Sequence, residues 1–333
     1  MRYIEHLRKT LPTMKKHLLM DLGNSGWLNL LPSLKTNRLV YRVGLHTMGF
    51  VMFLLRLPKY IVYLNPEKLI LPGFEVCVTT RCTLKCVDCT QRNTFYRSGK
   101  YAAVPEDSKL ENISASIGKV LAAIDGVVIM RIMGGEVLLW PPLPQLLDEI
   151  LASDKVFVLD VVTNGTLIPS GELLKRLKNK KAKVSISDYG VISSKKDALI
   201  ELFRENGVRF DVAFDDGKAG WRRIYKAKDG PELPRGRTDE ELGKIFKLCP
   251  SAKFCKHVID DRLYICAILA HMNKLKIKPF DGTDFVDLNL PAAQVRDGIE
   301  NFQSLDYLPA CDYCDYMTGE DIQPAIQEEE GGA

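Results

Sequence analysis

The chain has 333 residues, enough for one large domain with extensions or for two domains. A hydrophobic fraction of 46% and a charged fraction of 26% are those of a globular protein that can bury a core. Nine cysteines are too few for a secreted disulfide scaffold, and eight of them fall into two groups, which indicates metal ligation in a reducing compartment.

The first 70 residues carry the positive charge of the chain. They hold 11 Lys and Arg against 3 Asp and Glu, a net of +8, so the remainder, with 35 against 39, carries −4. We expect residues 1–70 to form a basic helical extension packed on the main domain, with peripheral contact to a membrane or an acidic partner as the alternative. The apolar run 43–55 is too short to span a bilayer and no cleavable signal peptide is evident, so we expect a cytoplasmic protein.

Beyond residue 70, short β-rich runs alternate with amphipathic helical ones. We expect strands at 74–79, 127–133, 156–163, 182–187 and 208–214, and helices at 113–124, 144–153, 171–178 and 196–205. Strands rich in Val, Ile and Leu, separated by helices, predict an α/β fold with a parallel sheet and helices outside it. Glycines and prolines in 217–247 predict a domain boundary near residue 235, which separates 71–235 from 236–322. We expect the acidic and glycine-rich tail 323–333 to be disordered.

Three cysteines follow the first of these strands, Cys82, Cys86 and Cys89, in the spacing C-x3-C-x2-C. A 4Fe–4S cube held by three thiolates has one iron without a protein ligand, and that iron is open to a small molecule. Half of a zinc site and the start of an electron-carrying ferredoxin are the alternatives, but both usually show other spacings.

Polar or glycine residues also follow the later strands. Because the carboxyl ends of parallel strands form the reaction face of α/β barrels, we expect these segments to share one rim with the cysteines. They are Gly134-Gly135-Glu136, Thr163-Asn164-Gly165, Ser185-Ile186-Ser187-Asp188 and Asp215-Asp216.

The cysteine triplet after one strand and Gly-Gly-Glu after the next resemble the radical S-adenosylmethionine (radical SAM) superfamily. The resemblance covers roughly residues 72–216 and implies a partial (β/α)6 TIM-like barrel. It implies a 4Fe–4S cluster on Cys82, Cys86 and Cys89 whose open iron is chelated by S-adenosylmethionine (AdoMet). The residues that would contact AdoMet are Gly134, Gly135, Glu136, Asn164, Ser185, Ser187 and Asp188.

Two positions depart from the pattern of the family. Asp88 stands where an aromatic residue usually precedes the third cysteine, and Val137 replaces the proline after Gly-Gly-Glu. Both departures concern the contacts to the adenine, because neither removes a cluster ligand.

The second group of cysteines resembles the auxiliary-cluster extensions of radical SAM enzymes, called SPASM and, in the shorter form, twitch. Its five cysteines fit one four-cysteine cluster better than two clusters, although Asp261 replaces the usual glycine before Cys266. The resemblance implies as ligands Cys249, Cys266, Cys311 and Cys314. Cys255 is left as a buried thiol, an alternative ligand or a hydrogen-atom donor, and a zinc ribbon is the alternative for the whole region. Cys77 is interpreted as a core residue.

The resemblance implies an enzyme that cleaves AdoMet and abstracts a hydrogen atom from its substrate. We favour epimerisation of a carbohydrate or aminocyclitol over dehydrogenation, with maturation of a ribosomal peptide and a non-enzymatic Fe–S or zinc module as the alternatives. Expected partners are a sugar-like small molecule and an electron donor such as flavodoxin or ferredoxin, and no nucleic acid. Possible substrate contacts near the rim are Tyr189, Asp215, Asp216, Trp221 and Arg222.

Overall fold

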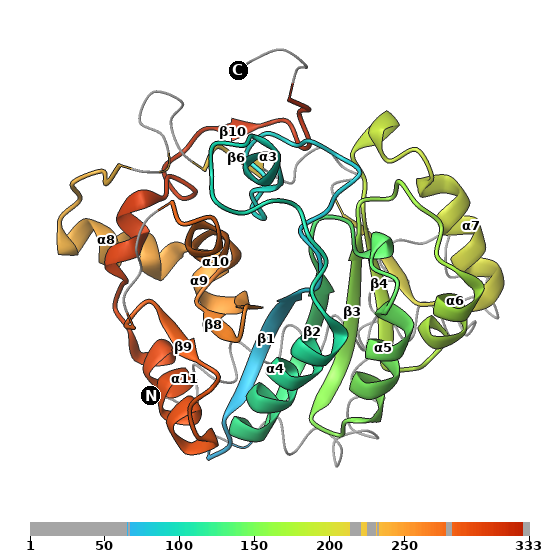
Figure 1. Ribbon diagram of the computed structural model, residues 1–333, viewed down its shortest axis with the longest axis horizontal. Coiled ribbons are helices and arrows are strands. Elements are labelled where there is room, and N and C mark those ends of the chain that lie inside the picture. Colours follow the sequence, from blue (N-terminus) through green and yellow to red (C-terminus); the bar gives the residue numbers. More distant parts are fainter. Residues whose placement is uncertain are drawn as a thin grey trace, which may run out of the picture.

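A single eight-stranded sheet runs through the computed structural model, which describes residues 65, 67–213, 221–224, 231, 233–277 and 282–328. Its strand order is β5-β4-β3-β2-β1-β7-β8-β9. The parallel strands in chain order are β1 (Ile70–Cys77), β2 (Gly126–Met133), β3 (Val156–Thr163), β4 (Ala182–Ser187) and β5 (Phe210–Ala213). Figure 1 shows β1 to β4 side by side.

We call β1 to β5 and the helices between them the N-terminal half. Its helices follow their strands as the apolar periodicity predicts. They are α3 (Asn93–Arg97), α4 (Leu110–Ala123), α5 (Leu143–Ala152), α6 (Gly171–Leu177) and α7 (Lys196–Asn206), with short 3-10 turns at Val137–Leu139 and Gly190–Ile192. α6 begins at Ser170, whose hydroxyl accepts from the N–H of Leu173, and α7 ends at Gly207, which has the left-handed φ of 66°. Apolar side chains of α4 and α5 share one core with alternate residues of β1 to β4.

The C-terminal half continues the same sheet. β7 (Lys256–Ile259) pairs in parallel with β1, and β8 (Arg262–Tyr264) and β9 (Phe285–Asp287) follow as antiparallel strands. The helices here are α8 (Asp239–Leu248), α9 (Pro250–Phe254), α10 (Ala267–Lys274) and α11 (Ala292–Ser304), with a 3-10 turn at Pro309–Tyr313. The predicted division at residue 235 therefore separates two segments that share a sheet, and it stays a prediction.

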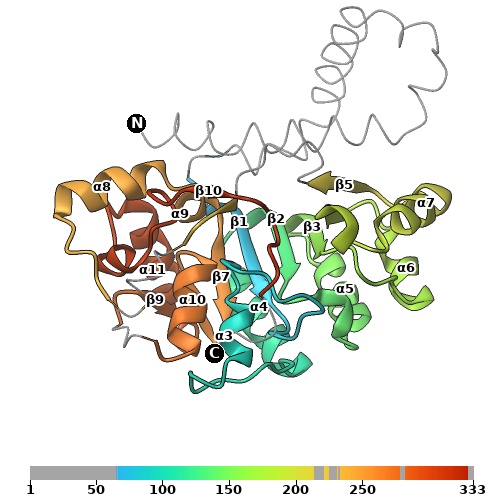
Figure 2. The ribbon, with the colours of Figure 1, turned by 90° about the horizontal axis from the view of Figure 1, so that it is seen from above.

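A small second sheet lies near the carboxyl ends of the parallel strands. In it β6 (Trp221–Arg222) pairs antiparallel with β10 (Asp321–Ile322). Figure 1 shows α3, β6 and β10 together above the upper ends of β1 to β4, and Figure 2 shows the C-terminal helices and α5 to α7 on opposite sides of β1.

The predicted α/β class with a parallel sheet is confirmed, and the described strands form an open sheet, with β5 and β9 at its edges, not a closed barrel. The predicted helical extension, up to residue 64, lies outside the described residues, as do Asp215 and Asp216. Within the described part of the chain, we find no helix long and apolar enough to cross a membrane.

Residues 323–328 of the tail, for which the composition predicts disorder, pair with the cysteine loop in this structure. The N–H of Val87 donates to the carbonyl of Ile326 at 2.7 Å, and the N–H of Glu328 donates to the carbonyl of Lys85 at 2.8 Å. Backbone pairing with a distant loop orders a segment whose composition alone predicts disorder. Residues 329–333 lie outside the described residues.

Candidate functional site

The cysteine triplet lies in the loop that leaves the carboxyl end of β1. Cys82, Cys86 and Cys89 share an apolar cluster with Leu84 and Ala325, against which Tyr189, Ile192 and Trp221 also pack. Burial raises the pKa of the thiols of Cys82 and Cys86 to about 12 and raises that of Cys89 as well. These groups are therefore protonated at neutral pH without a metal, and a metal would displace their protons on binding.

Each of the three sulfurs accepts a contact from a different side-chain amide. The pairs are Asn164 Nδ2 with Cys82 at 3.6 Å, Asn93 Nδ2 with Cys89 at 3.6 Å and Gln327 Nε2 with Cys86 at 3.3 Å. Donors of this kind orient ligands and stabilise the negative charge of a cluster. The donor set, three converging thiols that each have an amide donor, fits a 4Fe–4S cluster held by three residues.

Gly134 and Gly135 pack against the backbone of the same loop. A Cβ on Gly134 would lie 2.3 Å from the carbonyl oxygen of Thr79, and one on Gly135 would lie 2.0 Å from that of Arg81. The N–H of Gly135 donates to the Thr79 carbonyl, and that of Glu136 donates to the Arg81 carbonyl, both at 2.8 Å. The two glycines thus let the strand end approach the cysteine loop, whereas the sequence analysis assigned them a close approach to a ligand.

Glu136 is fully buried, and its carboxylate is occupied by internal donors. It accepts from the N–H of Leu138 at 3.0 Å, the hydroxyl of Thr163 at 2.8 Å and the N–H of Asn164 at 2.8 Å. Burial raises the pKa of this carboxyl, and these hydrogen bonds oppose the rise. In this structure Glu136 therefore positions Asn164, and its expected contact with AdoMet stays a prediction.

The predicted AdoMet residues on β3 and β4 divide into two sets. Asn164 reaches the cysteine loop, where its amide also donates to the hydroxyl of Thr83 at 3.0 Å. Ser187 lies at the carboxyl end of β4, and Asp188 follows it and pairs with Lys196 at 2.7 Å. Ser185 lies deeper in the sheet, where its hydroxyl donates to carboxylates of β3 and β5. Contact of any of these residues, Ser185 included, with AdoMet stays a prediction.

Asp88 has a structural role that explains its departure from the family pattern. Its carboxylate accepts from the N–H of Ile224 at 3.0 Å and pairs with Arg223 at 3.5 Å. These contacts bring β6 onto the cysteine loop, where Trp221 makes an edge contact with Tyr189 at 5.7 Å between ring centroids. Tyr189 and Trp221, which the sequence places at the rim, therefore lie beside the cysteine triplet.

A second group of four cysteines gathers between the C-terminal helices. Burial raises the pKa of Cys266, and the other three thiols raise it further; the same holds between Cys311 and Cys314. Each member lies at or near the end of an element. Arg235 and Arg237 both pair with Asp315, directly after the last of the four. Arg237 donates to the carbonyls of Cys311 and Cys314 and pairs with Asp315 at 2.6 Å. The four members are Cys249, Cys266, Cys311 and Cys314, which are the residues predicted for an auxiliary cluster.

Cys255 has different neighbours from these four. It ends α9, where its N–H donates to the carbonyl of Ser251 at 3.0 Å. Burial raises the pKa of its thiol, and the carboxylate of Glu75 raises it further, while Arg131 acts against this. Cys255 therefore lies against β1 and β2, on the face of the sheet opposite to α4 and α5.

That face carries a row of five charged residues and one histidine, one on each of six neighbouring strands. Arg131 pairs with Glu75 at 3.0 Å and with Asp160 at 3.2 Å. At one end Glu75 meets His257 at 3.4 Å, and at the other Lys183 pairs with Asp211 at 2.9 Å. The row was not predicted from the sequence, although four of its members, Glu75, Arg131, Asp160 and Asp211, each interrupt a largely apolar strand. We define the polar row as His257, Glu75, Arg131, Asp160, Lys183 and Asp211.

The family model of the radical SAM superfamily matches residues 76–249, just over half of the chain. The protein therefore belongs to the radical SAM superfamily, whose members are enzymes that use a 4Fe–4S cluster and AdoMet. The family and these two cofactors, expected from the sequence, are confirmed.

Solved structures with similar folds include three complexes. The match to anSMEcpe with bound AdoMet and Cp18Cys peptide has 22% identity, covers 43% of this chain and 42% of that chain, and has a TM-score of 0.34. The match to Streptococcus suis SuiB bound to S-adenosylmethionine has 19% identity, covers 43% and 33%, and has a TM-score of 0.33. The match to BtrN in complex with AdoMet and 2-DOIA has 14% identity, covers 76% and 97%, and has a TM-score of 0.47. The chain thus spans less than half of the length of the first two.

Proposed function

We propose that this radical SAM enzyme epimerises a hydroxylated small molecule of carbohydrate or aminocyclitol type, with Cys255 as the hydrogen-atom donor. The observation that carries the proposal is the place of Cys255. It lies against Glu75 and Arg131 of the polar row, whereas the other four C-terminal cysteines act on one another. Cys255 is not among the four cysteines predicted to hold the auxiliary cluster, and it lies on the face of the sheet that carries the polar row. This position suits a hydrogen-atom donor better than a cluster ligand.

The polar row supports a polar substrate. The side chain of Arg131 is 33% exposed and that of Asp211 is 25% exposed, so both remain partly accessible. Guanidinium donors and carboxylate acceptors in alternation match the donors and acceptors of a polyhydroxylated or amino-substituted ring. Tyr189 and Trp221, beside the cysteine triplet, offer apolar surface on which such a ring can pack.

In this proposal Cys82, Cys86 and Cys89 would hold the AdoMet-binding cluster, which would supply the hydrogen abstraction, and the four-cysteine group would hold a cluster able to pass single electrons. The protein residues decide the outcome. The raised pKa of Cys255 keeps its S–H bond intact at neutral pH, which a hydrogen-atom donor requires. Transfer of that hydrogen to the opposite face of the substrate carbon inverts the centre and leaves a sulfur radical. One electron from the external electron donor, of the flavodoxin or ferredoxin class, and one proton from water then return it to the thiol.

The first experiment tests the cofactors. The protein is reconstituted anaerobically with iron and sulfide and then given dithionite and AdoMet. We expect 5′-deoxyadenosine to form and about eight irons per chain to be bound. About four irons per chain would show that the auxiliary cluster is absent. Failure to form 5′-deoxyadenosine under any condition would rule out the proposed reaction.

The second experiment tests the donor. Candidate sugars and aminocyclitols are incubated with the reconstituted enzyme in deuterated water, and we expect one deuterium in the epimerised product, because a thiol exchanges its proton with solvent. Cys255→Ala should still form 5′-deoxyadenosine but no epimer. Ser251→Ala, on the same helix, is the matched control and should epimerise as the wild type does. An epimerising Cys255→Ala variant would exclude the donor role, and an oxidised product without deuterium would show a dehydrogenase.

A further inference from the structure

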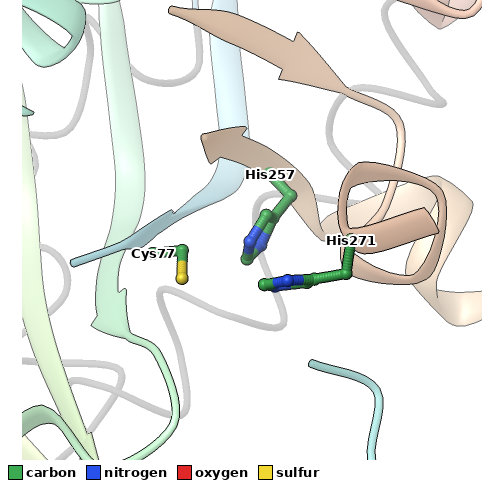
Figure 3. A group of neighbouring side chains, drawn as sticks. All are labelled: Cys77, His257 and His271. Carbon is green, nitrogen blue, oxygen red and sulfur yellow. The ribbon is translucent and has the colours of Figure 1, made fainter. Parts of the chain in front are cut away.

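Three buried side chains outside both cysteine groups converge at the join between the two halves of the sheet. Cys77 ends β1, His257 lies on β7 and His271 lies on α10, and one ligand atom of each lies within 4.8 Å of the others. Figure 3 shows the three side chains pointing toward one another from these elements. All are at most 1% exposed. The sequence analysis interpreted Cys77 as a core residue and did not single out either histidine.

The ring of His257 is oriented as in a metal ligand. Its Nδ1 faces the carboxylate of Glu75 at 3.4 Å. Its Nε2 is buried and has no hydrogen-bond partner among the described residues. A histidine whose one nitrogen donates to a carboxylate presents the lone pair of the other, which is the usual arrangement of carboxylate, histidine and metal. A buried nitrogen without a partner needs an explanation, and an ion is one of the few groups that supply it.

His271 is held by partners that can serve an ion in the same way. Its Nε2 lies 2.5 Å from the amide oxygen of Gln91, and its Nδ1 lies 2.7 Å from the hydroxyl of Tyr96. Burial lowers the pKa of the imidazole well below its usual range, so the ring is neutral, as ligation requires. On binding, one of these contacts is exchanged for the ion and the other remains to orient the ring.

We propose that Cys77, His257 and His271 bind a borderline transition-metal ion, Zn²⁺ in the first place, at a site separate from both Fe–S groups. One thiolate and two imidazoles are the ligand types that zinc prefers over hard cations. The ion joins β1 of the N-terminal half to β7 and α10 of the C-terminal half. Because Gln91 and Tyr96 belong to the segment after Cys89, and α10 begins after Cys266, the site also links the two cysteine-bearing loops.

The test measures zinc on the full-length holoenzyme. The protein is reconstituted anaerobically with iron and sulfide, incubated with Zn²⁺ and dialysed against EDTA, and its iron and zinc are measured by mass spectrometry. We expect about one zinc per chain in addition to the iron. Zinc K-edge absorption should show one sulfur at about 2.3 Å and nitrogen ligands at about 2.0–2.1 Å. If no zinc is retained above background, Cys77, His257 and His271 form only a hydrogen-bonded part of the core. If zinc is found with four sulfur ligands, it occupies the second cysteine group. Either result overturns the proposal.

Variants assign the ligands. Cys77→Ser and His257→Gln should each lower the retained zinc at least tenfold at unchanged iron and sulfide content. Tyr264→Phe is the matched control, because it alters the same buried cluster as Cys77 without removing a ligand, and it should retain the zinc. Retention by both ligand variants, or equal loss from the control, would contradict the assignment. The absorption spectrum of the wild type decides the question if a variant fails to fold.

Discussion

At the scale of single residues, the Gly-Gly-Glu segment shows how one motif serves packing as well as chemistry. Only glycine fits at position 135 beside the backbone of the cysteine loop. The Cβ of any other residue would lie 2.0 Å from the carbonyl oxygen of Arg81 and 2.9 Å from the Cβ of Cys82. Glu136 holds Asn164, which in turn reaches the sulfur of Cys82. The segment therefore positions Cys82, a predicted cluster ligand, from two sides.

Gly135→Ala should displace the cysteine loop. Overpacking of this kind costs about 1–3 kcal/mol, and the loop that must move carries Cys82. We expect a lower unfolding temperature and a loss of iron after reconstitution. Gly118→Ala is the control, because Gly118 is exposed in α4 with nothing within 4 Å of its added Cβ. It should be neutral or stabilising by up to about 1 kcal/mol. Normal iron content in Gly135→Ala would show that the loop tolerates the shift.

Glu75 gives the protein an acid-sensitive contact. Burial alone would raise its pKa, but the hydrogen bond from His257 and the charge of Arg131 outweigh burial and lower the pKa from 4.5 to about 2. A carboxyl with a lowered folded-state pKa stabilises the protein above pH 4.5, and that stability is lost as the pH falls toward 2.

Glu75→Gln should therefore weaken the dependence of stability on pH. The difference in unfolding free energy between wild type and variant should shrink by roughly 3 kcal/mol between pH 6 and pH 2. Urea unfolding at each pH measures it, and the exposed Glu111, replaced by Gln, is the control. A constant difference across this pH range would show that Glu75 ionises normally in the folded state.

At the scale of elements, the segment 323–328 behaves as a strap on the cysteine loop. Gln327 contacts the loop twice, since its amide oxygen accepts from the N–H of Lys85 at 2.8 Å and its amide nitrogen donates to the sulfur of Cys86. Ala325 is fully buried in the apolar cluster that holds the cysteines. The strap thus joins residues about 240 positions apart in the sequence.

Gln327→Leu should lower the midpoint potential of the AdoMet-binding cluster. A donor to a cluster sulfur stabilises the reduced, more negative state, so its removal favours the oxidised state. One hydrogen bond of ordinary strength corresponds to roughly 20–60 mV for a one-electron couple. Potentiometric titration followed by electron paramagnetic resonance measures the shift. Gln323→Leu, an exposed position in the same segment, should leave the potential unchanged, and equal potentials in all three proteins would contradict the role of Gln327.

The local sequence pattern predicted the elements of the N-terminal half well, because apolar periodicity and the positions of glycine and proline determine them. The strands at 156–163 and 182–187 appear at the predicted residues, and the helix expected at 113–124 spans Leu110–Ala123. The same reasoning could not predict the pairing of β7 with β1 or the strap, because both depend on partners far away in the chain. The cysteine triplet was predictable because its spacing is local, whereas Gln327 carries no local signal.

At the scale of the whole molecule, the polar row ties six strands from both halves of the sheet. Asp160 is fully buried near its centre and accepts from Arg131 at 3.2 Å and Ser185 at 2.8 Å, with Lys183 at 3.5 Å. Each charge is matched only when the parallel strands lie in this register, so a shift of one residue would bury unpaired charges. The row therefore specifies the alignment of the sheet as well as the surface offered to a substrate.

Asp160→Ala should destabilise the protein by about 3–5 kcal/mol, because it leaves the charges of Arg131 and Lys183 in a buried setting without their shared partner. Chemical unfolding measures the change, and Asp154→Ala, at an exposed position before β3, is the control. The double variant Asp160→Leu with Lys183→Met removes two opposite charges at once and should recover part of the lost stability. If the single variant is as stable as the control, the row contributes little to the fold, and its charges serve binding alone.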